Sequence, residues 1–256
     1  MTNERRVLVH PDRHALAASV AARFLTKTID IIDDRGRAHI ALTGGSIGID
    51  VLAAVNSSPA RDSIDWSRVH FWWGDERFVP RSDPERNERQ AREALLDHLA
   101  VPESNVHAFP SSDEHATIDE AADLYAAELT RFGEDGDRFP RFDITFLGVG
   151  PDGHIASLFP DHQGIRETEK TVIVERDSPK PPPERLSLTR PVINASERIW
   201  LVLCGGDKAS ALGLALAGAS YTEVPAAGAK GRKRTVFFVD QDAAINVPES
   251  LIAPSY

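Results

Sequence analysis

The chain has 256 residues, carries a formal net charge of −10 and is 41% hydrophobic. This length suits one large α/β domain or two small ones, and the hydrophobic fraction can build a sizeable core. The acidic balance argues against a nucleic-acid partner, because phosphate backbones bind basic surfaces. The single cysteine, Cys204, rules out an internal disulfide framework and is typical of a reducing compartment. With no visible signal peptide and no membrane-length apolar run, we expect a cytoplasmic protein.

Taken in chain order, the hydrophobic pattern predicts strands that alternate with helices. We expect strands at residues 7–10, 38–42, 69–73, 144–147, 171–174, 186–189, 199–204 and 235–239, and helices at residues 15–29, 49–55, 82–99, 117–132 and 208–216. This alternation indicates an α/β fold with a mainly parallel sheet and helices on both faces, in one domain over residues 1–256. The four prolines within residues 178–184 predict an extended surface loop.

Four of the predicted strands end in glycine and are followed at once by polar residues. These strand ends lie at residues 44–46, 74–77, 150–154 and 205–208. In open parallel sheets, ligands bind in the crevice beyond the carboxyl ends of the strands. If the four strands are neighbours, their polar residues meet at one edge of the sheet. An anionic ligand bound there needs local positive charge against the negative field of the whole chain.

Residues 148–153 match the dinucleotide pattern G-x-G-x-x-G, with Glu175 about 20 residues further on. We reject this interpretation, because Asp152 would place a carboxylate beside the pyrophosphate. Pro160 and Gly164 also interrupt the segment that should form the crossover helix, and the motif lies late in the chain. The glycines instead indicate that the backbone approaches something else closely.

Residues 44–48 match G-x-S-x-G between a strand and a helix, which is the context of a serine nucleophile. A serine hydrolase would combine Ser46 with Asp152 or Asp240 and a later histidine. In the other interpretation, residues 44–46 hold a phosphate at the amino end of the following helix, where free N–H groups and the helix dipole favour an anion. No recognisable histidine loop follows Asp240, which favours the phosphate interpretation, but the pattern alone leaves both open.

His154 follows Asp152 by two residues in a glycine-rich loop at a predicted strand end. A histidine oriented by a carboxylate is a candidate general base near neutral pH. The alternative is a structural Asp-Gly turn that includes a histidine. Asp161 and His162 lie nearby in sequence, but these residues match no metal-ligand spacing, and we predict no metal site.

Basic residues at the other strand ends are candidates to hold an anion. Arg77 follows Asp75 and Glu76, and its alternative role is a weak surface ion pair. Lys208 opens a predicted helix after two glycines and could point at a bound phosphate; its alternative is an ordinary solvated lysine. The basic run at residues 230–234 is more consistent with a solvated loop in so acidic a chain.

Together these motifs resemble the 6-phosphogluconolactonase family over nearly the whole chain. The most specific part is residues 148–160, Gly-Val-Gly-Pro-Asp-Gly-His-Ile-Ala-Ser-Leu-Phe-Pro. Supporting motifs occur in the family's order and spacing at residues 42–46, 73–80, 185–189 and 205–208, with Asn87 downstream of the second. The resemblance implies a three-layer, modified Rossmann-like fold shared with glucosamine-6-phosphate deaminases. It also implies cofactor-free hydrolysis of 6-phosphoglucono-δ-lactone in the oxidative pentose phosphate pathway.

The resemblance further implies roles for individual side chains. The residues implied to bind substrate are Gly44, Gly45, Ser46, Arg77, Arg185 and Lys208. The backbone of the first three would hold the phosphate, and the basic side chains would supply positive charge. The residues implied to act in catalysis are Asp75, Arg77, Asp152 and His154.

In this scheme His154 takes a proton from the attacking water and returns it to the departing ring oxygen. Either Asp152 or Asp75 would hold the imidazole, while Arg77 or loop N–H groups would face the developing oxyanion. A sugar phosphate lactone is then the expected partner, without nucleic acid or membrane, and we expect a monomer or a weak homodimer.

Two positions depart from the family pattern: Ile47-Gly48 stands where Thr-Pro is usual, and Ile155 stands where Thr is common. Neither removes a polar group assigned to the chemistry. A glucosamine-6-phosphate deaminase remains an alternative, but residues 157–159 are Ser-Leu-Phe where the resemblance to deaminases calls for an acid. A non-catalytic sugar-phosphate sensor is another alternative. Such a sensor should carry a DNA-binding module, and the short segment before the first strand has no room for a helix-turn-helix.

Overall fold

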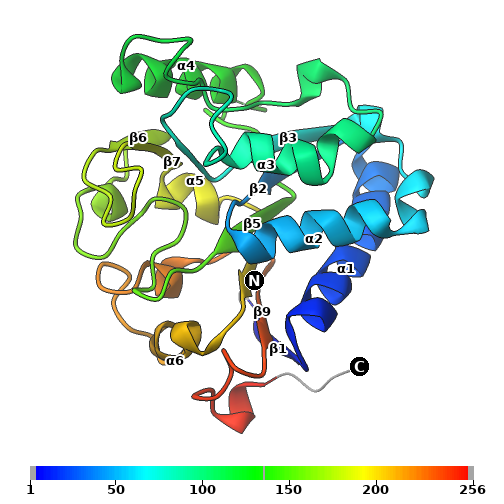
Figure 1. Ribbon diagram of the computed structural model, residues 1–256, viewed down its shortest axis with the longest axis vertical. Helices are drawn as coiled ribbons and strands as arrows, with labels where there is room; N and C mark the ends of the chain where they lie inside the picture. The colour runs from blue at the N-terminus through cyan, green and yellow to red at the C-terminus, as the bar shows by residue number, and fades with distance from the viewer. Residues whose placement is uncertain (1–3, 135, 253–256) are drawn as a thin grey trace.

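The computed structural model describes residues 4–134 and 136–252. Within these residues the main sheet has six parallel strands in the spatial order β1-β9-β8-β5-β2-β3 (Figure 1). In that order the strands are Glu4–His10, Arg234–Asp240, Arg198–Leu203, Ile144–Gly148, Ala38–Leu42 and Val69–Trp73. The predicted mainly parallel sheet is confirmed.

Helices cover both faces of this sheet, as predicted. The α-helices of the described chain are α1 Arg13–Arg35, α2 Ser46–Ser57, α3 Asn87–Ala94, α4 Ile118–Arg131, α5 Arg190–Asn194 and α6 Ala209–Leu216. α1 and α2 pack side by side on one face. α6 lies on the other face, because Arg5 of β1 donates to the carbonyl of Ala215 in α6, whereas the adjacent Arg6 faces α1. None of the helices described here is long and apolar enough to cross a membrane.

The central strands are buried, and most of their side chains on both faces are apolar. Every residue of β2 is buried, and so are the apolar residues of β8 between Ile199 and Leu203. Parallel strands covered by helices on both sides require such continuous apolar runs. The long α1 presents one apolar face to this core, begins at an Asp12 cap and ends at Gly36, whose φ of 76° suits glycine.

A second, smaller sheet was not predicted from the sequence. It is antiparallel, in the order β4-β7-β6, with strands Asp75–Arg77, Arg185–Leu188 and Val172–Glu175. β4 has only three residues, all charged, so it carries no hydrophobic strand pattern. The predicted helix at residues 82–99 is also shorter than expected: α3 begins at Asn87 and ends at Ala94, and a 3₁₀ turn, Leu96–His98, follows.

The strand order brings the four glycine-ended strands together. β8, β5, β2 and β3 are consecutive neighbours in the main sheet and run parallel. Their carboxyl ends therefore lie along one edge, as the pattern of strand ends predicts. Gly74, which follows β3, connects the two sheets. Its N–H donates to the carbonyl of Leu42 in β2, and its carbonyl accepts a hydrogen bond from the N–H of Leu188 in the small sheet.

Candidate active site

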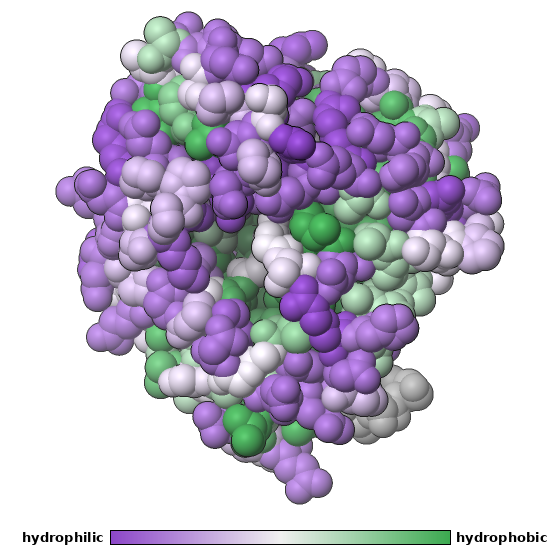
Figure 2. Space-filling model, in the orientation of Figure 1, coloured by the Kyte–Doolittle hydropathy of each residue, from purple (hydrophilic) through white to green (hydrophobic). Residues whose placement is uncertain are grey.

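An open cleft of about 460 Å³ lies along this edge, and Figure 2 shows a hollow near the centre of the corresponding face. Its lining includes eight of the nine residues singled out from the sequence: Gly44, Gly45, Ser46, Asp75, Arg77, His154, Arg185 and Lys208. The ninth, Asp152, does not line the cleft but contacts His154 directly. Side chains far apart in the chain are thus brought to one site.

The loop after β2 forms a cradle of backbone N–H groups. Gly45 has φ 82° and ψ 155°, a conformation that only glycine adopts readily, and it caps α2, which begins at Ser46. No side chain caps this helix end, so its first N–H groups are free to bind an anion. A Cβ on Gly44 would lie 1.8 Å from Oδ1 of Asn87, so the loop and Asn87 are in intimate contact.

The Ser46 hydroxyl has no hydrogen bond to a histidine or carboxylate within the described residues. A serine nucleophile needs a base within hydrogen-bond reach. Ser46 therefore lacks the arrangement of a catalytic serine, and the phosphate interpretation of this loop is the better supported one.

His154 and Asp152 form a close pair at the end of β5. Nδ1 of His154 lies 2.6 Å from Oδ1 of Asp152, and the ring packs 4.7 Å from the ring of Phe159. The tight turn depends on Gly150, where a Cβ would meet the imidazole at 2.1 Å. Partial burial tends to raise the pKa of Asp152, but the hydrogen bond and charge of His154 outweigh it and lower this pKa to about 2.

Asp75, the other carboxylate considered for orienting His154, is used elsewhere. Its Oδ2 accepts a hydrogen bond of 2.7 Å from Oγ of Ser157, and its backbone carbonyl accepts one of 2.9 Å from Nδ2 of Asn87. Within the described chain, no hydrogen bond joins Asp75 to His154. Of the two candidates, Asp152 is the one in contact with the imidazole.

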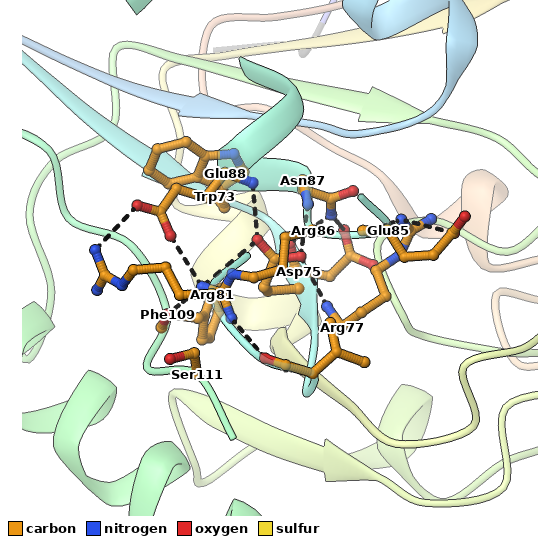
Figure 3. Close-up of polar contacts among 12 residues, drawn as sticks. Trp73, Asp75, Arg77, Arg81, Glu85, Arg86, Asn87, Glu88, Phe109 and Ser111 are labelled. Carbon is orange, nitrogen blue, oxygen red and sulfur yellow. Dashed lines mark hydrogen bonds and ion pairs between the residues drawn. The ribbon is translucent and has the colours of Figure 1, made fainter. Parts of the chain in front are cut away.

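A buried polar network fixes the segment that carries Asp75 and Arg77 (Figure 3). The Glu76 carboxylate accepts 2.8 Å hydrogen bonds from the backbone N–H groups of Arg77, Asn87 and Glu88, and so holds the start of α3 against β4. Complete burial raises the pKa of Glu76 to about 7, although Arg86 and these N–H groups act to lower it. The guanidinium of Arg86, itself fully buried, donates to Glu88 and to the carbonyl of Phe109.

The cations predicted to bind substrate differ in the ion pairs and hydrogen bonds that they already make. Lys208 pairs with the neighbouring Asp207. Arg77 donates to the carbonyl of Glu85. Arg185 is only 4% exposed, and its guanidinium donates to three consecutive carbonyls of the proline-rich loop. Burial lowers the pKa of Arg185. The hydrogen-bond partners of its guanidinium are thus carbonyls of the loop that precedes β7.

Several residues that line the cleft were given no role by the predictions from the sequence. The most notable are Arg13, Asn87, Lys180 and Asp207. Asn87 was noticed only as part of a motif, and Lys180 lay in a segment interpreted as a plain surface loop. Arg13 belongs to the first turn of α1, and its position gave no signal because it depends on α1 crossing beside α2. An asparagine at the first position of a helix and a lysine among prolines carry no chemical signature of their own.

The fold and cleft define a class of α/β protein with a histidine–carboxylate pair beside an anion cradle at one sheet edge. The family model of glucosamine-6-phosphate isomerases and 6-phosphogluconolactonases matches residues 11–238, and the chain belongs to this family. It is 49% identical to a 6-phosphogluconolactonase of Streptomyces coelicolor, over 100% of this chain and 99% of the relative. It is 43% identical to one of Mycobacterium tuberculosis, over 94% and 97%.

Solved structures agree with this assignment. The 6-phosphogluconolactonase of Trypanosoma brucei superposes with a TM-score of 0.85 and 26% identity, covering 96% of this chain and 100% of that one. A monomeric glucosamine-6-phosphate deaminase superposes with a TM-score of 0.77 over 94% of this chain and 99% of that one, at 18% identity. The second likeness shows a shared fold, as predicted for the deaminases.

Proposed function

We propose that this protein hydrolyses 6-phosphoglucono-δ-lactone to 6-phosphogluconate, as a step of the oxidative pentose phosphate pathway. The observation that carries the proposal is the His154–Asp152 pair, whose imidazole lines the same cleft as residues 44–46 at the uncapped amino end of α2. The substrate needs both features, because it combines a reactive ester with a phosphate dianion. The names of the most similar relatives support the same activity.

In the proposed mechanism, Nδ1 of His154 donates to Asp152, which leaves Nε2 to accept a proton from water. The water attacks the lactone carbonyl, and the imidazolium then gives the proton to the ring oxygen as the C–O bond breaks. Positioned acid–base catalysis of this kind supplies about 10²- to 10⁴-fold. Asp152 stabilises the imidazolium, and Arg77, which lines the cleft, faces the oxyanion.

The phosphate binds at the amino end of α2, where the N–H groups and helix dipole act together. Lys208, at the end of β8, adds positive charge from the other side of the cleft. A lactone is already an activated ester, so this proposal needs neither a metal nor a covalent intermediate.

A deaminase activity fits the site less well. Ser157 stands in the stretch where the deaminase resemblance calls for an acid, and it is fully buried and donates its hydroxyl to Asp75. Leu158 and Phe159 beside it are buried as well. This stretch therefore supplies no ionisable side chain to the cleft.

The test is to generate the lactone in situ from glucose 6-phosphate with a dehydrogenase, and to follow its disappearance with and without the protein. We expect rapid hydrolysis by the wild type and a loss of at least 100-fold in His154→Ala. His162→Ala is the matched control, because His162 pairs with Glu175 outside the cleft. Ammonia release from glucosamine 6-phosphate without lactone hydrolysis would instead support the deaminase.

Further expectations from the sequence, a cytoplasmic location and a monomer or weak homodimer, form part of this proposal. Fractionation of cells and sedimentation of the purified protein test them directly.

A further inference from the structure

We infer that Lys180 is a substrate-binding residue that contacts the phosphate, and that Arg185 is the positioning residue that presents it. The inference rests on the proposed function for the identity of the substrate. Neither role follows from the sequence, where residues 178–184 were expected to be a plain surface loop and Arg185 a direct phosphate ligand.

The proline-rich loop reaches into the site. Lys180 and Pro181 both line the cleft, together with Arg185, the first residue of β7. The loop has no helix or strand of its own. Backbone hydrogen bonds hold its two ends, from the N–H of Ser178 to the carbonyl of Pro183 and from the N–H of Phe78 to the carbonyl of Glu184. The carbonyls of residues 180–182 between them are held by side chains.

Arg185 supplies those contacts. Its Nη2 donates to the carbonyl of Lys180 at 2.8 Å and to that of Pro181 at 3.3 Å, and its Nε donates to that of Pro182 at 3.1 Å. A planar guanidinium can bind three carbonyls at once, which the single ammonium of a lysine cannot reproduce. Ser178 adds a fourth hydrogen bond, since its hydroxyl donates to the carbonyl of Lys180 at 2.9 Å. The backbone of Lys180 is thus fixed while its side chain is exposed.

The charge of Lys180 is unsatisfied, in contrast to those of Arg13, Arg77 and Lys208. Arg13 pairs with Asp50, Lys208 pairs with Asp207, and Arg77 is held by Glu85. Within the part of the chain that the structure describes, no carboxylate lies within ion-pair distance of the Lys180 ammonium. An unpaired cation that lines a cleft is free to bind an anion without first giving up a partner.

The substrate carries one charged group, its phosphate, because the lactone ring is neutral. In a chain of net charge −10, with Asp75 and Asp207 in the cleft lining, a dianion needs dedicated cations. The phosphate is therefore the group that Lys180 meets. A charge-assisted hydrogen bond of this kind has a typical strength of about 1.5–3 kcal/mol, which corresponds to about 10- to 100-fold in binding.

The first experiment compares Lys180→Met with the wild type on two substrates, the phosphorylated lactone and unphosphorylated glucono-δ-lactone. We expect kcat/KM for the phosphorylated lactone to fall about 10- to 100-fold, mainly through KM, with little change for the unphosphorylated one. Lys230→Met is the matched control, because it removes the same charge from a loop outside the cleft. Equal losses on both lactones, or none, would overturn the assignment.

The second experiment is a double-mutant cycle with Arg185→Lys, which keeps the charge but loses the three-carbonyl contact. If Arg185 acts by presenting Lys180, Arg185→Lys lowers kcat/KM in the wild-type background and changes it less than about 3-fold in the Lys180→Met background. Additive losses would show that Arg185 acts independently. Thermal unfolding of each variant separates a folding defect from this effect.

A binding measurement keeps the inference separate from the proposed activity. Titration calorimetry with 6-phosphogluconate should show weaker binding to Lys180→Met than to the wild type and to Lys230→Met. If the wild type failed to hydrolyse the lactone, the proposed function would be wrong. If the wild type were active and all three proteins bound 6-phosphogluconate equally, Lys180 would be excluded as a ligand.

Discussion

Nδ1 of His154 lies 2.6 Å from Oδ1 of Asp152, two residues earlier in the same turn. This contact fixes the tautomer, because an N–H at Nδ1 that donates to a carboxylate leaves the lone pair on Nε2. It also holds the ring against Phe159 at the cleft edge. The two residues therefore act as one unit, and changing either should affect the chemistry.

Asp152→Asn should lower kcat for lactone hydrolysis by about 100-fold or more while leaving the fold intact. The asparagine amide can no longer stabilise the imidazolium by charge, and it can favour the wrong tautomer. Steady-state kinetics on freshly generated lactone measure the loss. Asp161→Asn is the control, since Asp161 is exposed on the next turn and its φ of 62° suits asparagine. A wild-type rate in Asp152→Asn would show that His154 needs no carboxylate partner.

The low pKa of Asp152 also predicts a feature of the pH profile. Since His154 lowers this pKa to about 2, Asp152 stays ionised throughout the pH range in which the enzyme is folded and assayed. The stabilising contribution of the pair is present above the unfolded value of 3.8 and is lost as pH falls toward 2. The rate profile above pH 4 should contain no step from Asp152. A step that vanishes in Asp152→Asn would contradict this.

Gly44→Ala should destabilise the protein by about 1–3 kcal/mol and weaken phosphate binding. A Cβ there would stand 1.8 Å from Oδ1 of Asn87, so either the cradle or the amide must move. Gly74→Ala is a close control, because Gly74 also follows a strand of the main sheet, but its Cβ would meet only ordinary contacts, the nearest at 3.8 Å. Urea unfolding and KM measure the two effects. Equal stability of the two variants would contradict a tight contact between Gly44 and Asn87.

Glu76→Gln should lower the free energy of unfolding by about 1–3 kcal/mol. The carboxylate accepts three backbone N–H groups, and an amide would turn a donor toward one of them at a fully buried site. Glu85→Gln, a change of the same charge on a nearby exposed residue, should stay within about 0.5 kcal/mol. Urea unfolding at constant pH compares them, and indistinguishable midpoints would count against the predicted role of Glu76.

A buried histidine cluster predicts loss of stability in mild acid. His39 stacks on His70, which in turn stacks on His107. Burial, together with the neighbouring histidines, lowers the pKa of His39 from 6.5 to about 2 and that of His70 to about 4. Below pH 6.5 the unfolded chain therefore binds protons that the folded chain excludes, so stability falls as pH falls. For His39 alone the loss between pH 7 and pH 5 is about 2 kcal/mol.

Urea midpoints across this range test the cluster. Glu76 acts in the opposite sense, since its raised pKa of about 7 makes the folded state bind a proton more tightly as pH falls toward 4.5. The informative quantity is therefore the difference in pH slope between wild type and His39→Gln, in which Oε1 can still accept from Nε1 of Trp72. Parallel slopes would exclude His39 as a source of the acid sensitivity.

Strand and helix periodicity predicted most of the main sheet, and the glycines after its strands predicted where the cleft lies. The bounds of β2 and β3 agree with the predicted ranges residue for residue. This worked because apolar runs in a covered parallel sheet end abruptly at polar loops. The resemblance to the family added the roles of His154 and the cradle.

Strands were predicted where β6 and β7 lie, but their antiparallel sheet, its strand β4 and the lining residues outside the motifs were not predicted from the sequence. β4 is three charged residues whose burial depends on Glu76 meeting the start of α3, a contact across many residues. Lys180 lines the cleft from a loop whose carbonyls accept hydrogen bonds from Arg185, and no local pattern encodes such a turn. Contacts of this kind arise from tertiary packing rather than from periodicity.

The strand order has a consequence for how the active site is assembled. The cradle and Asp75 precede α4 in the chain, while His154, Lys180 and Lys208 all follow it. Three strand pairs join these two portions, β2 with β5, β1 with β9 and β4 with β7. A polypeptide cut between α4 and β5 should give two fragments that are each inactive, and whose reassociation a phosphorylated ligand should promote because it contacts both.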